Sequence, residues 1–291
     1  MSLHIFGSIV TGYGCAANNR GETEGNITTL QKILWNGQVH TTVSSEAIRW
    51  ALRYFWQRSG FEVNRVWIDE KEDHAWKDPA WAGWEKPDGR TYIDDDLLGY
   101  MVAEGAKVEG QKGSTLKRRG VMEIARAISL SPYAGDISFN AKSGVKGRTS
   151  LYGTEMHATR YQYGFAITPQ RLRSPIRCLD ALDAVAGLSE VAGNHGRFLF
   201  DFSPESVVFR ISEDPAPRIL YCFEESSPRV TANGLCRKVE SGDVQPEELY
   251  LGGPIAERPE VRGLGLKVCL PGVRAVLRAV KDELKNRLGL E

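Results

Sequence analysis

The hydrophobic positions at the start of the chain alternate loosely, and they predict a β-strand from Leu3 to Thr11. In a second pattern, apolar residues recur at helical spacing on one face: Ala47, Ile48, Ala51, Leu52 and Phe55. The residues between these patterns, from Asn18 to His40, are mostly polar and predict a long loop with a basic turn. A strand, a loop and a helix in this order form the opening half of a βαβ unit.

The second half of the chain resembles another βαβ half. Helical spacing recurs within Ile176 to Leu188, and β-rich runs follow in residues 193–211 and 218–223. The clearest amphipathic helix runs from Val273 to Leu288, with an inward face of Val276, Leu277, Val280, Leu284 and Leu288. Two interleaved βαβ halves predict an α+β fold with a ferredoxin-like palm that carries insertions.

The middle of the chain predicts the insertions. Residues 61–113 place four tryptophans among acids, prolines and glycines, a poor rhythm for a compact core, so this segment folds over the core or reaches a neighbour. Residues 135–168 predict a projecting β-hairpin with a basic, glycine-rich tip that contains Lys142, Lys146 and Arg148. On its return arm, Tyr161, Tyr163 and Phe165 alternate on one strand face, and we expect them in the core or half-buried.

Charge changes this picture through its distribution. The formal net charge is zero, which excludes a uniformly basic coat for nucleic acid. Residues 62–104 carry twelve acids and five Lys or Arg, whereas residues 107–177 carry thirteen Lys or Arg and four acids. Three interpretations stay open: a basic groove, a surface that binds head-to-tail to another copy, and two solvated faces.

Motifs for catalysis are absent from the sequence. No GxSxG, HExxH or paired cysteine motif occurs, and the five cysteines and five histidines are scattered. Asp94, Asp95 and Asp96 are consecutive and do not converge easily on a metal, so a helix start or surface acidity is favoured. The scattered cysteines, with no signal peptide and no long apolar run, predict a cytoplasmic protein that does not enter a membrane. We expect binding rather than catalysis, with no cofactor and no metal.

Polar and basic side chains gather around the predicted helix start, where free N–H groups and the helix dipole attract an anion. The candidate residues are Asn18, Asn19, Arg20, Gln31, Lys32, Thr42, Ser44, Ser45 and Arg49. An ordinary capped surface helix is the alternative. The densest basic cluster, Lys117, Arg118 and Arg119, predicts an anion-binding loop or a solvated one. His157 is a lone histidine and is expected to be a hydrogen-bonded structural residue.

The stretch NNRGETEGNITTLQKILWNGQVHTTVSSEAIRWALR resembles the N-terminal signature of the DevR-like CRISPR-associated backbone proteins. These form the seventh CRISPR-associated (Cas) family, within the repeat-associated RAMP superfamily. Further blocks match in order, namely YIDDDLLGYM, KRRGVMEIARAISLSPYAGD, TRYQYGFAI and AGNHGRFLFDFSPESVVFR. The resemblance therefore covers nearly the whole chain, and it is to subtype I-B or I-A.

This resemblance implies an RRM-like palm at residues 1–60 and 165–291, an inserted finger or web region at 61–134, and a β-hairpin thumb at 135–164. It implies a non-catalytic backbone subunit of Cascade, the type I RNA-guided surveillance complex of antiviral defence. Copies would oligomerise head-to-tail in a helical filament along the CRISPR guide RNA and hold it by phosphate and sugar contacts. Kinked guide segments would then pair with target DNA. Other implied partners are the cap, large and small Cascade subunits, with a helicase-nuclease or transposon-targeting proteins.

The resemblance also implies roles for individual residues. Asn19, Arg20, Gln31 and Lys32 would line the guide groove, Ser44, Ser45 and Arg49 would hold a phosphate, and Lys117, Arg118 and Arg119 would line the groove from the insertion. Thr154, Met156 and His157 would wedge beside the kinked nucleotide, and Asn194 and His195 form a further loop candidate.

Related type III backbone subunits cut target RNA with an aspartate in the early loop. The first aspartate here is Asp69, so we expect no target-RNA cleavage. The alternative function is an RNA endonuclease of the same superfamily, with His40 as its acid–base residue.

Overall fold

The computed structural model describes residues 2–103, 115–141, 151–193, 195–226 and 229–290. Its centre is a nine-stranded sheet of order β21-β20-β17-β1-β16-β12-β6-β5, with β11 also paired to β16. Its strands are β1 (His4–Thr11), β5 (Lys32–Trp35), β6 (Gln38–Val43), β11 (Met122–Ile124), β12 (Ala127–Ser129), β16 (Tyr161–Ile167), β17 (Pro204–Ser212), β20 (Leu249–Gly252) and β21 (Val268–Leu270). The β20–β21 pair is parallel, and the other pairs of this sheet are antiparallel.

Strand β1 is buried on both faces, which makes the sheet the middle layer of the molecule. Ile5 and Ile9 join one hydrophobic cluster, whereas Phe6 and Val10 join a second one, because alternate residues of a strand point to opposite faces. Gly7 lies opposite Phe165 of β16, and a Cβ atom at this glycine would come within 2.3 Å of the Phe165 ring. A glycine is therefore required where the aromatic ring crosses β1.

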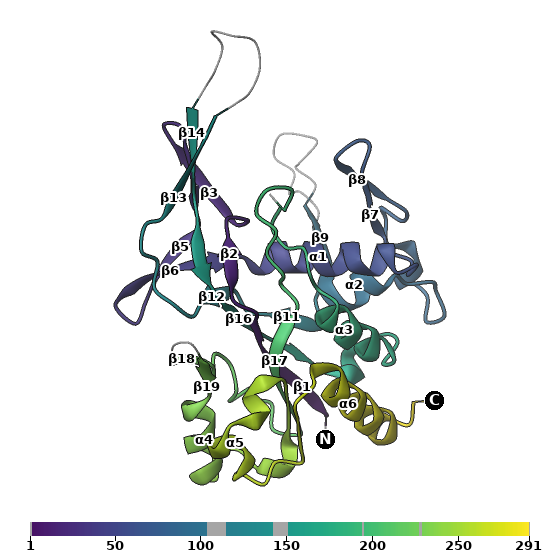
Figure 1. The fold of residues 1–291 in the computed structure, drawn as a ribbon. Helices are drawn as coiled ribbons and strands as arrows, with labels where there is room; N and C mark the ends of the chain where they lie inside the picture. The colour runs from purple at the N-terminus through teal and green to yellow at the C-terminus, as the bar shows by residue number, and fades with distance from the viewer. Residues whose placement is uncertain (1, 104–114, 142–150, 194, 227–228, 291) are drawn as a thin grey trace.

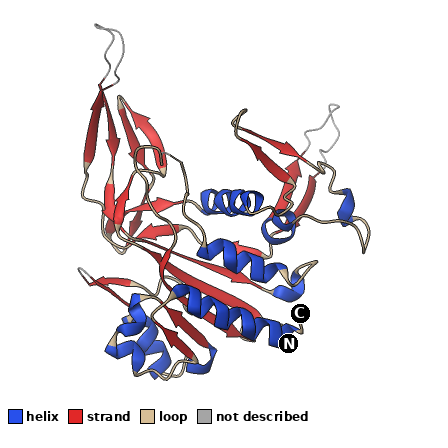
Figure 2. Cartoon of the chain, turned by 45° about the vertical axis from the view of Figure 1, so that its right-hand side comes forward, coloured by secondary structure: helices blue, strands red, loops and turns tan. Residues whose placement is uncertain are grey.

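Helices cover both faces of the sheet (Figures 1 and 2). The first cluster packs beneath α1 (Ser45–Arg58), α3 (Arg177–Ala186) and α6 (Val273–Leu288), and the second beneath α4 (Asn233–Glu240) and α5 (Pro259–Arg262). The predicted inward face of the last helix is confirmed, since Val276, Leu277, Val280 and Leu284 are buried. Short 3-10 helices are η1 (Ala82–Trp84), η2 (Pro169–Arg171), η3 (Pro246–Glu248) and η4 (Pro254–Glu257). Among the described residues, no helix combines the length and apolarity needed to cross a membrane.

A second sheet, of order β13-β14-β4-β3, projects from the body as an arm (Figure 1). It is built from β3 (Arg20–Glu24), β4 (Ile27–Leu30), β13 (Ile137–Ala141) and β14 (Leu151–Glu155), and β2 (Gly14–Ala16) pairs with β15 (His157–Thr159) separately. The predicted long loop at residues 18–40 is thus wrong, because most of it forms β3 to β6. Asn36 and Gly37 both have positive φ, 49° and 79°, and form the tight Asn-Gly turn that joins β5 to β6.

The segment after α1 forms small elements on the other side of that helix. They are β7 (Arg65–Ile68), β8 (Asp73–Trp76), α2 (Ile93–Leu98), β9 (Gly99–Ala103) and β10 (Thr115–Arg119). In both views the arm and the β7–β8 hairpin rise on either side of α1 (Figures 1 and 2). The remaining hairpin joins β18 (Glu224–Ser226) to β19 (Arg229–Thr231). The predicted basic tip at Lys142, Lys146 and Arg148 lies outside the described residues.

The main sheet includes strands from the predicted insertion and from the predicted thumb. β11 and β12 belong to the main sheet although they lie within the predicted insertion, and β16 begins at Tyr161, inside the predicted thumb. The prediction of core aromatics on β16 is confirmed, since Tyr161, Tyr163 and Phe165 are at most 2% exposed. The strand predicted at residues 218–223 is absent, because Arg218 and Tyr221 adopt positive φ angles of 55° and 52°.

Candidate nucleic-acid interface

The start of α1 is an occupied helix cap. The Ser44 hydroxyl accepts a hydrogen bond from the Ala47 N–H at 3.2 Å, as an N-cap serine does. Ser45 donates to the Glu46 carboxylate at 3.2 Å, and this acid in the first turn already complements the helix dipole. The helix start is thus capped within the chain, as the ordinary-cap alternative expects, and the phosphate contacts of Ser44 and Ser45 stay predictions.

Five predicted contact residues are buried beside the base of the arm. Asn18, Asn19, Thr42, Thr154 and His157 are at most 5% exposed. The Asn18 amide donates to the Val191 carbonyl at 2.6 Å, and the Asn19 amide donates to the Thr42 carbonyl. The side chains of Asn18, Asn19, Thr42 and His157 have hydrogen-bond partners within the protein. These five residues therefore serve the interior of the single chain, and their direct RNA contacts stay predictions.

A buried hydrogen-bond network ties β15 to β6 and β16. His157 Nδ1 lies 2.7 Å from the Thr41 hydroxyl, which lies 2.8 Å from the Tyr161 hydroxyl. His157 Nε2 lies 3.2 Å from the Pro132 carbonyl oxygen. The structural role expected for this histidine from the sequence alone is confirmed. His40 is similar, at 5% exposed, with its Nδ1 2.7 Å from the Ser129 carbonyl oxygen.

We expect stability to fall in mild acid because of His157. Burial lowers the pKa of this imidazole from its ordinary value of 6.5, and nearby His40 adds to the shift, while the Pro132 carbonyl and Asp136 oppose it. Below pH 6.5 the unfolded chain then binds the proton more readily than the folded one. The free energy of unfolding should therefore be fully retained above 6.5 and decline as pH falls toward the folded-state pKa.

Two measurements check this expectation. An NMR titration of the folded protein should give His157 a midpoint below 6.5, and urea unfolding of His157→Gln should depend less on pH than that of the wild type. A midpoint at or above 6.5, or an unchanged pH slope in the variant, would show that burial does not govern this histidine.

A cleft of about 540 Å³ lies between α1 and the inserted segment, and we call it the web cleft. Its charged and aromatic lining comprises Glu46, Arg49, Trp50, Arg53, Arg65, Trp76, Asp94, Asp95, Tyr100 and Arg118. The Arg49 guanidinium donates to the Leu98 carbonyl, and burial together with the neighbouring Arg53 lowers its pKa. Among the described residues, the Nε atoms of Arg65 and Arg118 are buried without a hydrogen-bond partner. Two predicted residues from distant segments, Arg49 and Arg118, thus meet in one cationic and aromatic cleft.

The three consecutive aspartates form a buried hub beside the web cleft. Asp94, Asp95 and Asp96 are at most 2% exposed, so the predicted surface acidity is wrong, although they do lie in the first turn of α2. Asp94 pairs with Arg53 at 3.1 Å and accepts the N–H groups of Asn64 and Arg65. Burial, followed by the charge of Asp94, raises the pKa of Asp95 to about 6.

Asp96 connects the acidic and basic blocks of the sequence. Its carboxylate lies 3.1 Å from Arg118 and 2.8 Å from Arg177, and it accepts the N–H groups of Arg173 and Ser174. The Arg118 guanidinium also stacks 4.1 Å from the centre of the Trp84 ring. The two blocks therefore neutralise each other partly inside one chain, which none of the three interpretations anticipated, and Arg118 serves the fold as well as the cleft.

The other predicted residues differ in how accessible they are. Lys117 and Arg20 are exposed on β10 and β3, and Arg119 pairs with Glu123. Lys32 pairs with Glu155 and lies 4.8 Å from the Tyr133 ring centre. The other predicted contact residues are less accessible. The Gln31 side chain accepts a hydrogen bond from Arg126 at 3.2 Å, Met156 is half-buried, and His195 Nε2 lies 3.0 Å from the Val191 carbonyl oxygen. Asn194 lies outside the described residues.

Sequence reasoning missed several residues of the web cleft. Arg53 did carry a signal in the sequence, because it lies four positions after Arg49 on the same helix face, although it was not among the candidate residues. Arg65, Trp76 and Tyr100 carried no such signal, since each belongs to a short strand or its end in a segment that lacks a clear period.

We compared the chain with known protein families and solved structures. No protein-family model matches the chain. Chains of two solved structures, a "CRISPR RNA-guided surveillance complex, pre-nicking" and a "CRISPR RNA-guided surveillance complex", superpose with TM-scores of 0.57 and 0.54 at 13% and 16% identity. The matches cover 98% and 97% of this chain and 100% and 99% of those chains. The fold is therefore that of a subunit found in such complexes.

A protein of Myxococcus xanthus (strain DK1622) described as "CRISPR-associated protein Cas7/Cst2/DevR" is 57% identical over 304 residues, and the match covers 99% of both chains. The chain belongs to the Cas7/Cst2/DevR family of CRISPR-associated proteins, as the sequence resemblance predicted.

Proposed function

We propose that this protein is a non-catalytic backbone subunit of a type I CRISPR surveillance complex, of subtype I-B or I-A. Copies assemble head-to-tail along the CRISPR guide RNA, hold it by phosphate and sugar contacts, and present it for pairing with target DNA. The observation that carries the proposal is the 57% identity to a Cas7/Cst2/DevR protein over 99% of both chains.

The arrangement of the strands supports a ferredoxin-like palm. The elements β1, α1, β12, β16, α3 and β17 occur in this order in the chain, with other elements inserted between them, and their strands lie side by side in the order β17-β1-β16-β12. This is the strand order of a βαββαβ unit, with α1 and α3 packed on the same hydrophobic cluster. In this proposal the arm is the thumb, and residues from β7 to β10 are the finger or web.

Exposed cations on either side of α1 support a backbone-binding groove. Arg20 lies on the arm, Lys117 lies on β10, and the web cleft places Arg49 beside aromatic rings. Guanidinium and ammonium groups neutralise phosphates without reading bases, and aromatic faces accept any base. The groove would therefore hold guides of any sequence.

The absence of catalysis is part of the proposal. The segment from Cys15 to Gly25 offers only Glu22 and Glu24 as acids, with no aspartate. The histidine suspected in the endonuclease alternative, His40, is 5% exposed and engaged with Ser129, so it is not placed to reach an RNA strand.

Lys117→Ala tests the groove. We expect the slope of log K against log[salt] for single-stranded RNA to become shallower by about 0.7, which is roughly a fivefold loss of affinity at 0.1 M salt, equally for unrelated RNA sequences. Fluorescence anisotropy with labelled oligonucleotides measures both quantities. Lys285→Ala, exposed on α6, is the matched control.

Three outcomes would count against the proposal. A loss confined to one RNA sequence would indicate base reading, equal effects of the two lysine variants would indicate non-specific attraction, and cleavage of the RNA in the presence of Mg²⁺ would indicate an enzyme.

A further inference from the structure

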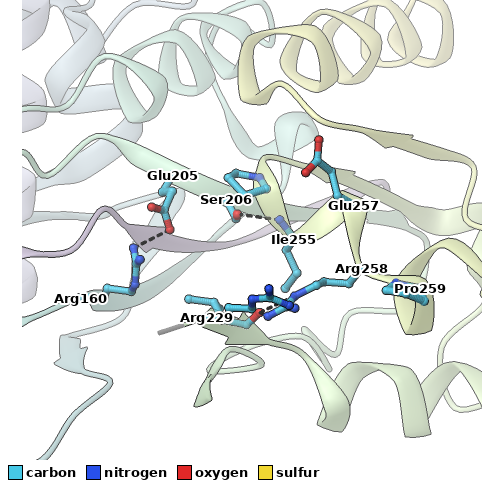
Figure 3. Close-up of a pocket in the computed structure, with 10 residues that line it drawn as sticks. Arg160, Glu205, Ser206, Arg229, Ile255, Glu257, Arg258 and Pro259 are labelled. Atoms are coloured by element: carbon cyan, nitrogen blue, oxygen red, sulfur yellow. Dashed lines mark hydrogen bonds and ion pairs between the residues drawn. The ribbon is translucent and has the colours of Figure 1, made fainter. Parts of the chain in front are cut away.

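A second pocket lies away from α1 and the web cleft. It has a volume of about 450 Å³ and is lined by residues at the start of β17, by residues 254–259 after β20, by Arg229 of β19, and by Arg160, which lies between β15 and β16. Its charged lining is Arg160, Glu205, Arg229, Glu257 and Arg258 (Figure 3). We call it the arginine pocket.

The three arginines of this pocket are not equally neutralised. Arg160 pairs with Glu205 at 2.5 Å. Arg258 directs its Nε and one terminal nitrogen to the Val230 carbonyl oxygen at 3.3 Å and 3.1 Å, which positions the guanidinium without cancelling its charge. The Arg229 side chain is exposed, and its guanidinium makes no hydrogen bond or ion pair with the other described residues. In Figure 3 the Glu257 carboxylate points away from Arg229 and Arg258. The guanidinium groups of Arg229 and Arg258 thus share a pocket in which no described carboxylate pairs with either of them.

The shape of the pocket favours a particular kind of anion. Guanidinium groups bind phosphate in a bidentate manner, and a pair of them fits a phosphodiester better than a point charge. The volume of about 450 Å³ falls within the range of about 300–1,000 Å³ that holds a small molecule and exceeds what one carboxylate side chain fills.

An exposed aromatic ring stands beside the pocket. Tyr13, in the turn after β1, is 60% exposed, and the Arg160 guanidinium lies 5.8 Å from its ring centre. An exposed ring beside arginines is the combination that receives a base while the cations hold its phosphate. A protein carboxylate would make no use of this ring.

From this geometry we infer that the arginine pocket binds one phosphate and its nucleoside from a single-stranded nucleic acid, at a position separate from the groove around α1. The inference rests on the proposed function, because it supplies a second point of attachment for a strand that the protein already holds. The strand is the guide RNA or the target DNA, which share this chemistry.

Arg229→Ala tests the pocket, because the side chain is exposed and removing it should leave the melting temperature unchanged. We expect about a fivefold weaker affinity for a labelled 30-nucleotide single-stranded RNA at 0.1 M salt, with a salt slope shallower by about 0.7. Arg229→Lys should recover part of the loss. Arg278→Ala, an exposed arginine on the solvent face of α6, is the matched control and should bind as the wild type does.

A second titration identifies which nucleic acid the pocket binds. Guide-loaded protein is titrated with complementary DNA, and a loss of affinity that appears only in this titration assigns the phosphate to the target DNA. Either loss supports the site.

Other outcomes overturn the inference. If Arg229→Ala and Arg278→Ala bind with the same affinity in both titrations while Lys117→Ala still binds more weakly, the pocket is not a nucleic-acid site and the proposed function stands. If only self-association weakens, the pocket holds a carboxylate of a neighbouring copy instead. If the wild type binds no RNA, the proposed function fails together with this site.

Discussion

Replacing Asp96 with alanine is expected to lower the free energy of unfolding by about 3–5 kcal/mol, the cost of removing one partner of a buried ion pair. Its carboxylate has no exposed surface and pairs with Arg118 and Arg177 at 3.1 Å and 2.8 Å. Both guanidinium groups are largely shielded from solvent, at 27% and 17% exposed, and each loses this carboxylate. The N–H groups of Arg173 and Ser174 lose an acceptor at the same time, and an unsatisfied buried donor is costly by itself.

Urea unfolding at pH 7 measures this effect. Asp282→Ala is the matched control, because Asp282 is exposed on α6 and should change stability by less than about 0.5 kcal/mol, as is usual for a surface substitution. A loss below about 1 kcal/mol for Asp96→Ala would mean that the arginines find other partners and that the aspartate hub is dispensable.

The double substitution Phe139→Asp and Leu151→Asp is expected to prevent assembly along RNA while leaving the single copy folded. In the β13–β14 register, Phe139 lies opposite Gly153 and Leu151 opposite Ala141, so both side chains project from the same face of the arm. They are 78% and 67% exposed, and Ile137 on the same face is 37% exposed. An apolar face on a projecting element marks an interaction surface. A hot-spot side chain costs at least about 2 kcal/mol when it is lost, which is roughly a thirtyfold change in association.

Sedimentation of the protein with a guide-length RNA distinguishes assembly from binding. The arm variant should remain in small complexes at concentrations where the wild type forms long ones, with circular dichroism unchanged. Ile176→Asp, a comparable exposed apolar residue at 42%, controls for added charge and should assemble normally. Normal assembly of the arm variant would place the contact between copies elsewhere.

The elements that could be predicted from the sequence are those specified by local periodicity. Leu277 and its neighbours repeat at helical spacing, and Ile5 and Ile9 alternate, so α6 and β1 were found. The β5–β6 hairpin at the edge of the main sheet was missed because the Asn36-Gly37 turn was not recognised as a hairpin signal. The buried aspartates could not be inferred in the same way. Asp96 meets Arg177 across 81 residues, and no spacing rule connects them.

In the candidate site, too, local sequence predicted some features, whereas others depended on the folded chain. Residue types near the start of α1 indicated phosphate binding, but burial decided which of them are accessible. Asn18 and Asn19 look like ideal donors in the sequence, yet their amides are used by carbonyls of the chain itself. Lys117 is exposed on β10, whereas Arg49 lines the web cleft and donates to the Leu98 carbonyl, a contact that forms only after the insertion folds back beside α1.

The arm has a consequence for synthesis of the protein. Its sheet joins β4 to β14 in parallel, with Gly153 beside Ile27 and Thr154 beside Thr28, so its two halves come from opposite ends of the first 155 residues. A nascent chain that has only β3 and β4 outside the ribosome holds an isolated hairpin, which is marginally stable in water. Closing this long-range contact is slow, and it waits for the second half of the arm. The surface with Phe139 and Leu151 therefore appears only after more than half of the chain has been translated. In this way the timing of translation delays any contact between copies through the arm.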